Sequence, residues 1–207
     1  MQESLAGIDE GTKQTVRRTI SALQARGIAT VFVPNREAAL EATRQMIPTG
    51  SRVAHGSSTT LEKIGFVARM KSPSSTCRYL NAEWSAETDP AKRVRLRAKL
   101  SVEADYYLGS VQAIAETGEV VGADGSGSRQ AFYVYGPPRV IWVSGINKLV
   151  PTLQEAIRRV REVALPLEDK RMKNLGASGS AIGKLVIYER ERPGRISLIL
   201  VGEALGF

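Results

Sequence analysis

The chain has 207 residues, a formal net charge of +8, and a single cysteine and a single histidine, Cys77 and His55. This length can bury a real core, and no segment has the ~20 apolar residues that cross a bilayer. One cysteine excludes an internal disulfide and a Cys-based iron–sulfur or zinc site, and one histidine argues against the usual zinc sites. We therefore expect a cytoplasmic protein that uses no metal and no cofactor.

The first part of the chain alternates helix-like and strand-like segments. Apolar residues at helical spacing predict an amphipathic helix from Asp9 to about Arg26. The β-branched run 28–33 predicts a strand covered on both faces, and Asn35 is positioned to cap a second helix. Residues 52–55 predict another short strand.

The loop that follows, 56–62, is rich in glycine, serine and threonine. Thr59 and Glu62 have the spacing of a capping box, which predicts a helix just after the glycine and serines. Unpaired N–H groups at such a point favour an anion, whereas a capped turn without a ligand is the alternative. His55 precedes the loop as a structural or catalytic histidine. The candidate ligand-binding residues here are Gly56, Ser57, Ser58, Thr59 and Thr60.

Residues 71–87 are polar and irregular, and they predict a loop or flap around a short strand at 78–80. Cys77 lies in this loop, where we interpret it as a buried or incidental thiol. Asp89 and a following proline then start a helix that carries the basic run 92–99. The basic residues of the chain are interleaved with acids, so this run predicts a solvated face, with anionic-ligand or nucleic-acid contact as the alternative.

The stretch 116–130 looks least like scaffold. A polar turn, Glu116–Gly118, leads through a β-like run into a glycine/serine loop that ends at Arg129. Glycines allow close backbone approach, hydroxyls and free N–H groups bind anions, and arginine offers a planar cationic fork. The candidate ligand-binding residues here are Thr117, Gly118, Asp124, Gly125, Ser126, Gly127, Ser128 and Arg129.

A helix from Ser128 should stop at the Gly-Pro-Pro run, and residues 139–144 then predict a buried strand. The strand exits through the loop 145–148, at the strand end where ligands collect in open α/β sheets. Lys148 either places an ammonium there or is an exposed or structural lysine. The candidate ligand-binding residues of this loop are Gly145, Asn147 and Lys148.

The last part begins with a helix that Thr152 caps, and its arginines are predicted to form a solvated face. These arginines are Arg158, Arg159 and Arg161. A glycine-rich connector then precedes strand-like runs at 184–188 and 196–201. The alternation of helices and strands predicts a three-layer α/β fold, with a mostly parallel sheet flanked by helices. We expect one domain, 1–207, that opens with an N-terminal helical segment, 1–26.

Several segments together resemble the lactate-utilisation (LUD) domain family: 56–65, 115–118, 145–151, 156–160 and the tail 200–207. The resemblance implies the NagB/RpiA/CoA-transferase-like fold of ribose-phosphate isomerases, glucosamine-phosphate deaminases and CoA transferases. The family is associated with bacterial operons that oxidise lactate to pyruvate through iron–sulfur proteins. Cluster binding does not carry over to a chain with one cysteine.

Two functions follow from the resemblance. The first is an accessory protein of lactate or other carboxylate metabolism, which binds a small anionic metabolite (a carboxylate, a phosphate ester or an acyl-CoA). Iron–sulfur partner proteins would then do the redox chemistry. The second is an autonomous enzyme, similar to acyl-CoA transferases or phosphosugar isomerases, with Glu116 as its catalytic carboxylate; a structural Glu116 is the alternative. We expect no nucleic-acid or membrane partner. The sequence leaves open whether the chain forms a homo-oligomer.

Overall fold

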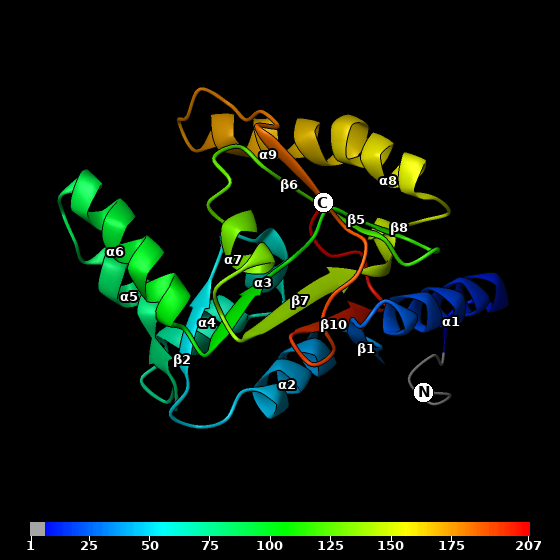
Figure 1. Cartoon of the computed structure of the whole chain (residues 1–207), viewed down its shortest axis with the longest axis horizontal. Helices are drawn as coiled ribbons and strands as arrows, with labels where there is room; N and C mark the ends of the chain where they lie inside the picture. Colours follow the sequence, from blue (N-terminus) through cyan, green and yellow to red (C-terminus); the bar gives the residue numbers. More distant parts are fainter. Residues whose placement is uncertain (1–6) are drawn as a thin grey trace.

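The computed structural model describes residues 7–207, and its centre is a six-stranded sheet in which all paired strands run parallel. Its strands are β1 (Ala29–Val33), β2 (Arg52–His55), β3 (Arg78–Tyr79), β4 (Tyr106–Gly109), β7 (Arg139–Gly145) and β10 (Ile196–Val201). The order β1-β10-β7-β4-β2-β3 places the last strand of the chain in the interior of the sheet (Figure 1). The predicted parallel α/β sheet is confirmed.

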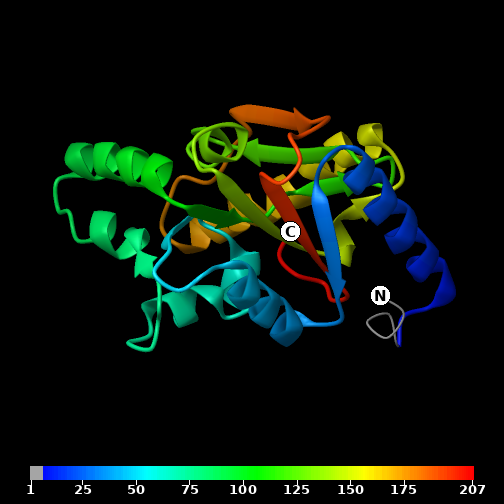
Figure 2. The same cartoon turned by 60° about the horizontal axis from the view of Figure 1, so that its bottom comes forward.

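Helices cover both faces of this sheet, so the molecule has the three layers that the sequence predicts (Figure 2). One face carries α1 (Glu10–Ala25), α5 (Leu80–Ser85), α6 (Pro90–Glu103) and α7 (Gln130–Val134), and the other carries α2 (Arg36–Met46), α3 (Thr59–Lys63) and α4 (Phe66–Lys71). On β10, Leu198 and Leu200 join the first core, while Ile199 and Val201 join the second. Alternate side chains of one strand thus serve both layers.

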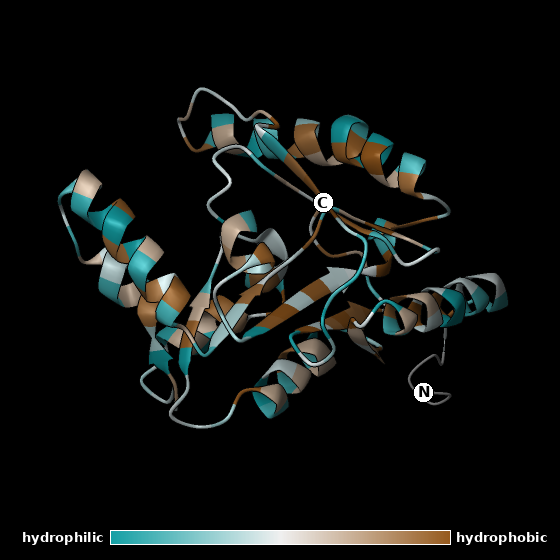
Figure 3. Cartoon of the chain, viewed as in Figure 1, coloured by the Kyte–Doolittle hydropathy of each residue, from teal (hydrophilic) through white to brown (hydrophobic). Residues whose placement is uncertain are grey.

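Hydropathy follows the same division. Figure 3 shows hydrophobic residues along the central strands, and alternating hydrophobic and hydrophilic turns along the helices. This banding is expected of helices that bury one stripe and expose the other. Within residues 7–207 we found no helix that is both long and apolar enough to cross a membrane.

A second sheet of four strands lies beside the first and was not predicted as a separate unit. Its strands are β5 (Ala113–Ala115), β6 (Val120–Asp124), β8 (Leu149–Val150) and β9 (Lys184–Tyr188), in the order β8-β5-β6-β9. The β5–β6 and β6–β9 pairs are antiparallel, and the β5–β8 pair is parallel. Strands β5 and β8 are too short to carry a periodic signal, and β9, which is predicted as a strand, pairs with a segment far away in sequence, so periodicity does not assign these strands to a sheet of their own.

The second sheet is covered by one long, irregular helical segment. It consists of α8 (Leu153–Arg159), a π-helical turn (Val160–Ala164) and α9 (Leu165–Asn174). Pro166 has no N–H group, so the helical hydrogen bond to the carbonyl of Glu162 cannot form. The π turn lies just before this proline, and such turns are often found at functional sites.

The helix caps mostly agree with the sequence. Asp9, Asn35, Asp89 and Thr152 each accept a hydrogen bond from a backbone N–H in the first turn of their helices. The exception is α3, where the predicted capping residue was wrong. Ser58 caps this helix through a 3.3 Å bond from the N–H of Leu61, so α3 begins at Thr59.

Two further boundaries differ from the prediction. The polar segment 71–87 was expected as a loop around a short strand, but it also contains helix α5. Leu80 and Trp84 are spaced four apart and both are buried, so packing overrides the polar composition. Helix α7 was expected from Ser128 and begins at Gln130. Residues 1–6 of the predicted N-terminal segment lie outside the described residues.

Candidate functional site

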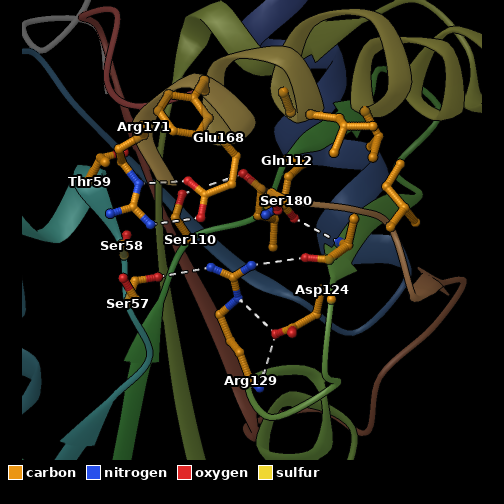
Figure 4. A pocket seen from close by; sticks show the side chains of 18 of the residues that line it. Ser57, Ser58, Thr59, Ser110, Gln112, Asp124, Arg129, Glu168, Arg171 and Ser180 are labelled. Carbon is orange, nitrogen blue, oxygen red and sulfur yellow. Dashed lines mark hydrogen bonds and ion pairs between the residues drawn. The ribbon is translucent and has the colours of Figure 1, made fainter. Parts of the chain in front are cut away.

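A cavity of about 320 Å³ lies at the carboxyl edge of the parallel sheet, between that edge, the second sheet and α9. Residues that directly follow β2, β4 and β7 contribute to its wall, and residues of β6 and of the loop after it form another part. This is the edge at which open α/β sheets bind ligands. Figure 4 shows the polar side chains that meet there.

Lys148 forms part of the cavity wall and is almost fully buried, with 1% of its surface exposed. It lies in the single 3-10 turn that follows β7. Its Nζ donates to Ser110 Oγ (2.9 Å), the carbonyl of Val111 (3.0 Å) and Thr60 Oγ1 (3.3 Å). The prediction left open an exposed, a structural or a ligand-facing lysine, and the exposed alternative was wrong.

Burial, with a smaller contribution from the nearby cations Arg159, Arg129 and Lys63, lowers the pKa of Lys148 from its ordinary value of 10.5 to about 7. Buried charges are usually paired with an opposite charge. Within residues 7–207, no carboxylate forms an ion pair with Lys148, and its three partners are neutral oxygens. The ammonium form is therefore hydrogen-bonded but not neutralised.

Arg129 connects two walls of the cavity (Figure 4). Its guanidinium donates to the carbonyls of Ser57 and Ala123, each at 2.9 Å, and its Nε lies 3.8 Å from Asp124 Oδ2. The loop after β2 and the end of β6 are thereby fastened together. Gly56 makes room for this contact, because a Cβ there would lie 2.9 Å from Arg129 Cδ.

The glycine/serine loop after β6 binds a carboxylate, but that carboxylate is the chain's own. Asp124 accepts from the backbone N–H groups of Ser126 (3.1 Å), Gly127 (3.0 Å) and Arg129 (3.1 Å). These amides, which the sequence offers to a ligand, are already satisfied within the protein. Asp124, Gly125 and Ser128 line the cavity, whereas Ser126 and Gly127 do not.

Further polar side chains of the wall come from segments outside the three candidate loops. Arg171 and Glu168 on α9 form an ion pair with two 2.7 Å contacts (Figure 4). Arg97 comes from α6, and Ser110 directly follows β4. Ser110 could have been found by the rule that pointed to the loops after β2 and β7, because it follows a strand end. The helical residues carry no such signal.

The charges of the wall are predominantly positive. Four cationic side chains, Arg97, Arg129, Lys148 and Arg171, face two carboxylates, Asp124 and Glu168. The two carboxylates are paired with Arg129 and Arg171. The hydroxyl groups of residues 57–60 and of Ser110 add neutral donors and acceptors to the same space. An anion is the ligand that this balance favours.

The loop after β7 contributes only Lys148 to the wall. Asn147 instead holds the last residues of the chain, since it accepts from the N–H of Leu205 (3.0 Å) and donates to the carbonyl of Gly206 (3.2 Å). A Cβ on Gly145 would lie 2.3 Å from the carbonyl oxygen of Glu203. Gly145 and Asn147 therefore support the position of the turn that carries Lys148.

Glu116 lies outside the cavity. Its carboxylate accepts from Arg18 Nη2 (2.8 Å) and Nε (3.2 Å), so it ties the β5–β6 turn to α1. Thr117 accepts a hydrogen bond from Arg26 through its carbonyl, and Gly118 has a φ of +96° and packs against Ala22. The structure thus brings the candidate residues of loops 56–60 and 124–129 together with Lys148, and leaves Glu116–Gly118 apart.

Arg159 was predicted to lie on a solvated face, and this prediction was wrong. It is buried and donates to the carbonyls of Gln112 and Asn147. Arg159 thus holds the turn that carries Lys148 and the segment after β4 that contacts Lys148 Nζ. Arg158 and Arg161 are not buried. The helix is amphipathic as expected, but its buried face also includes Arg159, because the guanidinium donates to two backbone carbonyls that need a hydrogen-bond donor.

His55 and Cys77 lie apart from this cavity. His55 is buried, with Nδ1 2.8 Å from the carbonyl of Gly56 and Nε2 2.7 Å from the hydroxyl of Tyr79, and burial lowers its pKa. These contacts fit a neutral, structural histidine. Cys77 is partly exposed and borders a second cavity of about 180 Å³ between α2 and α4.

The chain was compared with families of known proteins, with solved structures and with curated proteins. The family model described as the LUD domain matches residues 16–201. Among solved structures, the chain is similar to a DUF162 family protein from Deinococcus radiodurans at 12% identity and a TM-score of 0.53. That alignment covers 92% of this chain and 98% of the other. The search of curated proteins found no match.

Proposed function

This chain belongs to the LUD domain family, and we propose that it binds a small anionic metabolite in the cavity around Lys148. In this proposal the protein is an accessory component of lactate or other carboxylate metabolism. It supplies a binding site, and redox chemistry belongs to iron–sulfur partner proteins, because the single cysteine here provides no cluster ligands.

The observation that carries the proposal is the buried ammonium of Lys148, which has no carboxylate partner within residues 7–207 and opens onto a cavity. A ligand anion would supply the missing counter-charge in a place from which water is largely excluded. Electrostatic attraction is stronger there than at an exposed site. Arg129 and Arg171 would add to the same attraction.

The size of the cavity restricts the ligand. A volume of about 320 Å³ lies at the lower end of the roughly 300–1,000 Å³ found for ligand pockets. A compact carboxylate or a sugar phosphate fits such a space, whereas an entire acyl-CoA does not. The proposal therefore favours the first two of the three ligand classes named from the sequence.

The alternative enzyme would use Glu116 as its catalytic carboxylate. The position of Glu116 gives this alternative no support, because its carboxylate is held by Arg18 and does not line the cavity. A nucleophile has to reach the substrate within about 3–3.5 Å. We accordingly keep ligand binding, and not a Glu116-dependent reaction, as the proposed function.

Thermal-shift and calorimetric titrations test the proposal. Lactate, pyruvate, inorganic phosphate and ribose 5-phosphate are the probes, and glycerol is the neutral control. A ligand at a hundred times its Kd stabilises a protein by about 2.7 kcal/mol, which corresponds to a Tm increase of roughly 5–10 °C at this chain length. We expect at least one anion to give this increase, and glycerol to give none.

Two lysine substitutions make the titration specific to the cavity. Lys148→Met removes the buried ammonium, and Lys92→Met removes an exposed one from α6. The Tm increase should vanish in the first variant and persist in the second. A Tm increase that persists in Lys148→Met would overturn the proposal. The proposal would also be overturned if no anion raised the Tm of the unmodified protein.

A further inference from the structure

The surroundings of Lys148 differ from those of a buried lysine that serves only to hold the fold. Such a lysine is ordinarily paired with a carboxylate, because an unpaired buried charge is costly. Here the three partners of Nζ are two hydroxyls and one carbonyl, and the charged groups that act on it most strongly are Arg159 and Arg129. Burial and the neighbouring cations both favour the free amine.

A free amine at the wall of a cavity is a nucleophile. Lysines become reactive when they are desolvated or placed next to another cation, and Lys148 meets both conditions. Burial and the two arginines lower its pKa to about 7, so at neutral pH its neutral fraction exceeds that of an ordinary lysine by roughly a thousandfold. Within the described chain, Lys148 is the one lysine that lines this cavity.

The rest of the wall suits a substrate with two functional groups. Arg171 and Arg97 present guanidinium groups, which favour a carboxylate or a phosphate. Apolar side chains such as Val111, Val160 and Ile182 line other parts of the wall and would exclude water from a reacting carbonyl. A carbonyl compound that carries an anionic group could contact the arginines at one end and Lys148 at the other.

We propose that the cavity takes a carbonyl compound bearing a carboxylate or phosphate group, and that Nζ of Lys148 forms a reversible imine with its carbonyl carbon. This inference rests on the proposed function, since it adds a covalent step to the same anion site. It names the substrate class as 2-oxo acids or phosphorylated sugars, which share these two groups.

The step is balanced without an oxidant or a reductant. The lone pair of Nζ attacks the carbonyl carbon while the π electrons move to the oxygen, which takes a proton. Nζ loses a proton to give a carbinolamine. The carbinolamine hydroxyl then takes a proton, the C–O bond breaks and water leaves as the nitrogen lone pair forms the C=N bond, and loss of the remaining N–H proton gives the imine. Thr60 and Ser110, whose hydroxyls lie 3.3 and 2.9 Å from Nζ, are positioned to pass these protons.

Reductive trapping tests this inference on the full chain. The protein is incubated with cyanoborohydride and, in separate reactions, with pyruvate, glyoxylate or ribose 5-phosphate. Hydride adds to the imine carbon and leaves a stable secondary amine, which intact mass and peptide mapping locate. We expect one adduct per chain on Lys148, in excess over all exposed lysines by about tenfold or more, given its larger neutral fraction. The arm that reacts distinguishes oxo acids from sugar phosphates.

The map of the unmodified protein decides the location of the adduct even if variants of Lys148 fail to fold. Adducts spread over exposed lysines, or none at Lys148, would overturn the inference. Ser110→Ala should slow adduct formation without moving it to another lysine, and unchanged rates would remove the hydroxyl from the mechanism. If any of the anions raises the Tm in a Lys148-dependent way and no adduct forms, the anion site stands and the imine falls. If no anion raises the Tm and no adduct forms, both proposals fall.

Discussion

Replacing Lys148 with methionine should change how the stability of the protein depends on pH. The pKa of Lys148 falls from 10.5 in the unfolded chain to about 7 in the folded protein. Between these values the unfolded chain binds more protons than the folded protein, so the free energy of unfolding rises with pH. Below the folded-state pKa the full cost of burying the charge is present, and above the unfolded-state pKa it is absent.

The size of this effect follows from the two pKa values. Each pKa unit is worth about 1.4 kcal/mol, so the full cost is about 5 kcal/mol. Between about pH 7 and pH 9.5, the unmodified protein should gain about 3 kcal/mol relative to Lys148→Met. The variant also leaves Thr60, Ser110 and the carbonyl of Val111 without their donor, but that loss is the same at every pH and does not change the slope.

Urea unfolding of both proteins at several pH values measures this difference directly. Titration of all other groups cancels when the two curves are subtracted, provided that the folds are the same by circular dichroism. Lys92→Met, which removes an exposed ammonium, should differ from the unmodified protein by less than about 0.5 kcal/mol. A difference between the unmodified protein and Lys148→Met that stays constant over this pH range would refute the reasoning.

Three further substitutions test the surroundings of the cavity. Arg129→Met removes the donors to the carbonyls of Ser57 and Ala123. It should lower the free energy of unfolding, measured in urea, by about 2–5 kcal/mol. An unchanged urea midpoint would show that these hydrogen bonds do not hold the two walls together. Gly109→Ala places a Cβ 1.5 Å from the hydroxyl oxygen of Tyr133, so thermal unfolding should report a loss of about 1–3 kcal/mol, and a neutral result would contradict this packing. Glu116→Gln removes the charge from the partly exposed pair with Arg18 and affects a long contact with Thr15. It should cost less than about 1 kcal/mol and leave anion binding unchanged in calorimetry; weaker binding would return Glu116 to the site.

The sequence predicts the fold well where long apolar strands follow one another. The runs 28–33, 139–144 and 196–201 contain β1, nearly all of β7 and β10, because a strand buried on both faces is continuously apolar. The second sheet could not be predicted in the same way. The run 184–188 predicts β9 itself, but its pairing with β6 joins segments some 60 residues apart in sequence, and β5 and β8 have only three and two residues.

The candidate site was predictable to the extent that it follows strand ends. Loop 56–60 and Lys148 come directly after β2 and β7, so one rule points to both. Glu116 was grouped with Arg129 because they are close in sequence. Strand β6 separates them, and its five residues span roughly 13–17 Å. Arg171 was missed, and ligand contact was only the alternative for the run 92–99 that contains Arg97, because a basic residue on a helix looks the same whether it faces solvent or a cavity.

A crystal structure with the tightest-binding anion of the titrations would show whether Lys148 lies in the binding site. We expect the ligand in the 320 Å³ cavity, with its anionic group within hydrogen-bonding distance of Lys148, Arg129 or Arg171. A ligand bound instead in the second cavity beside Cys77, or on the basic face of α6, would contradict it.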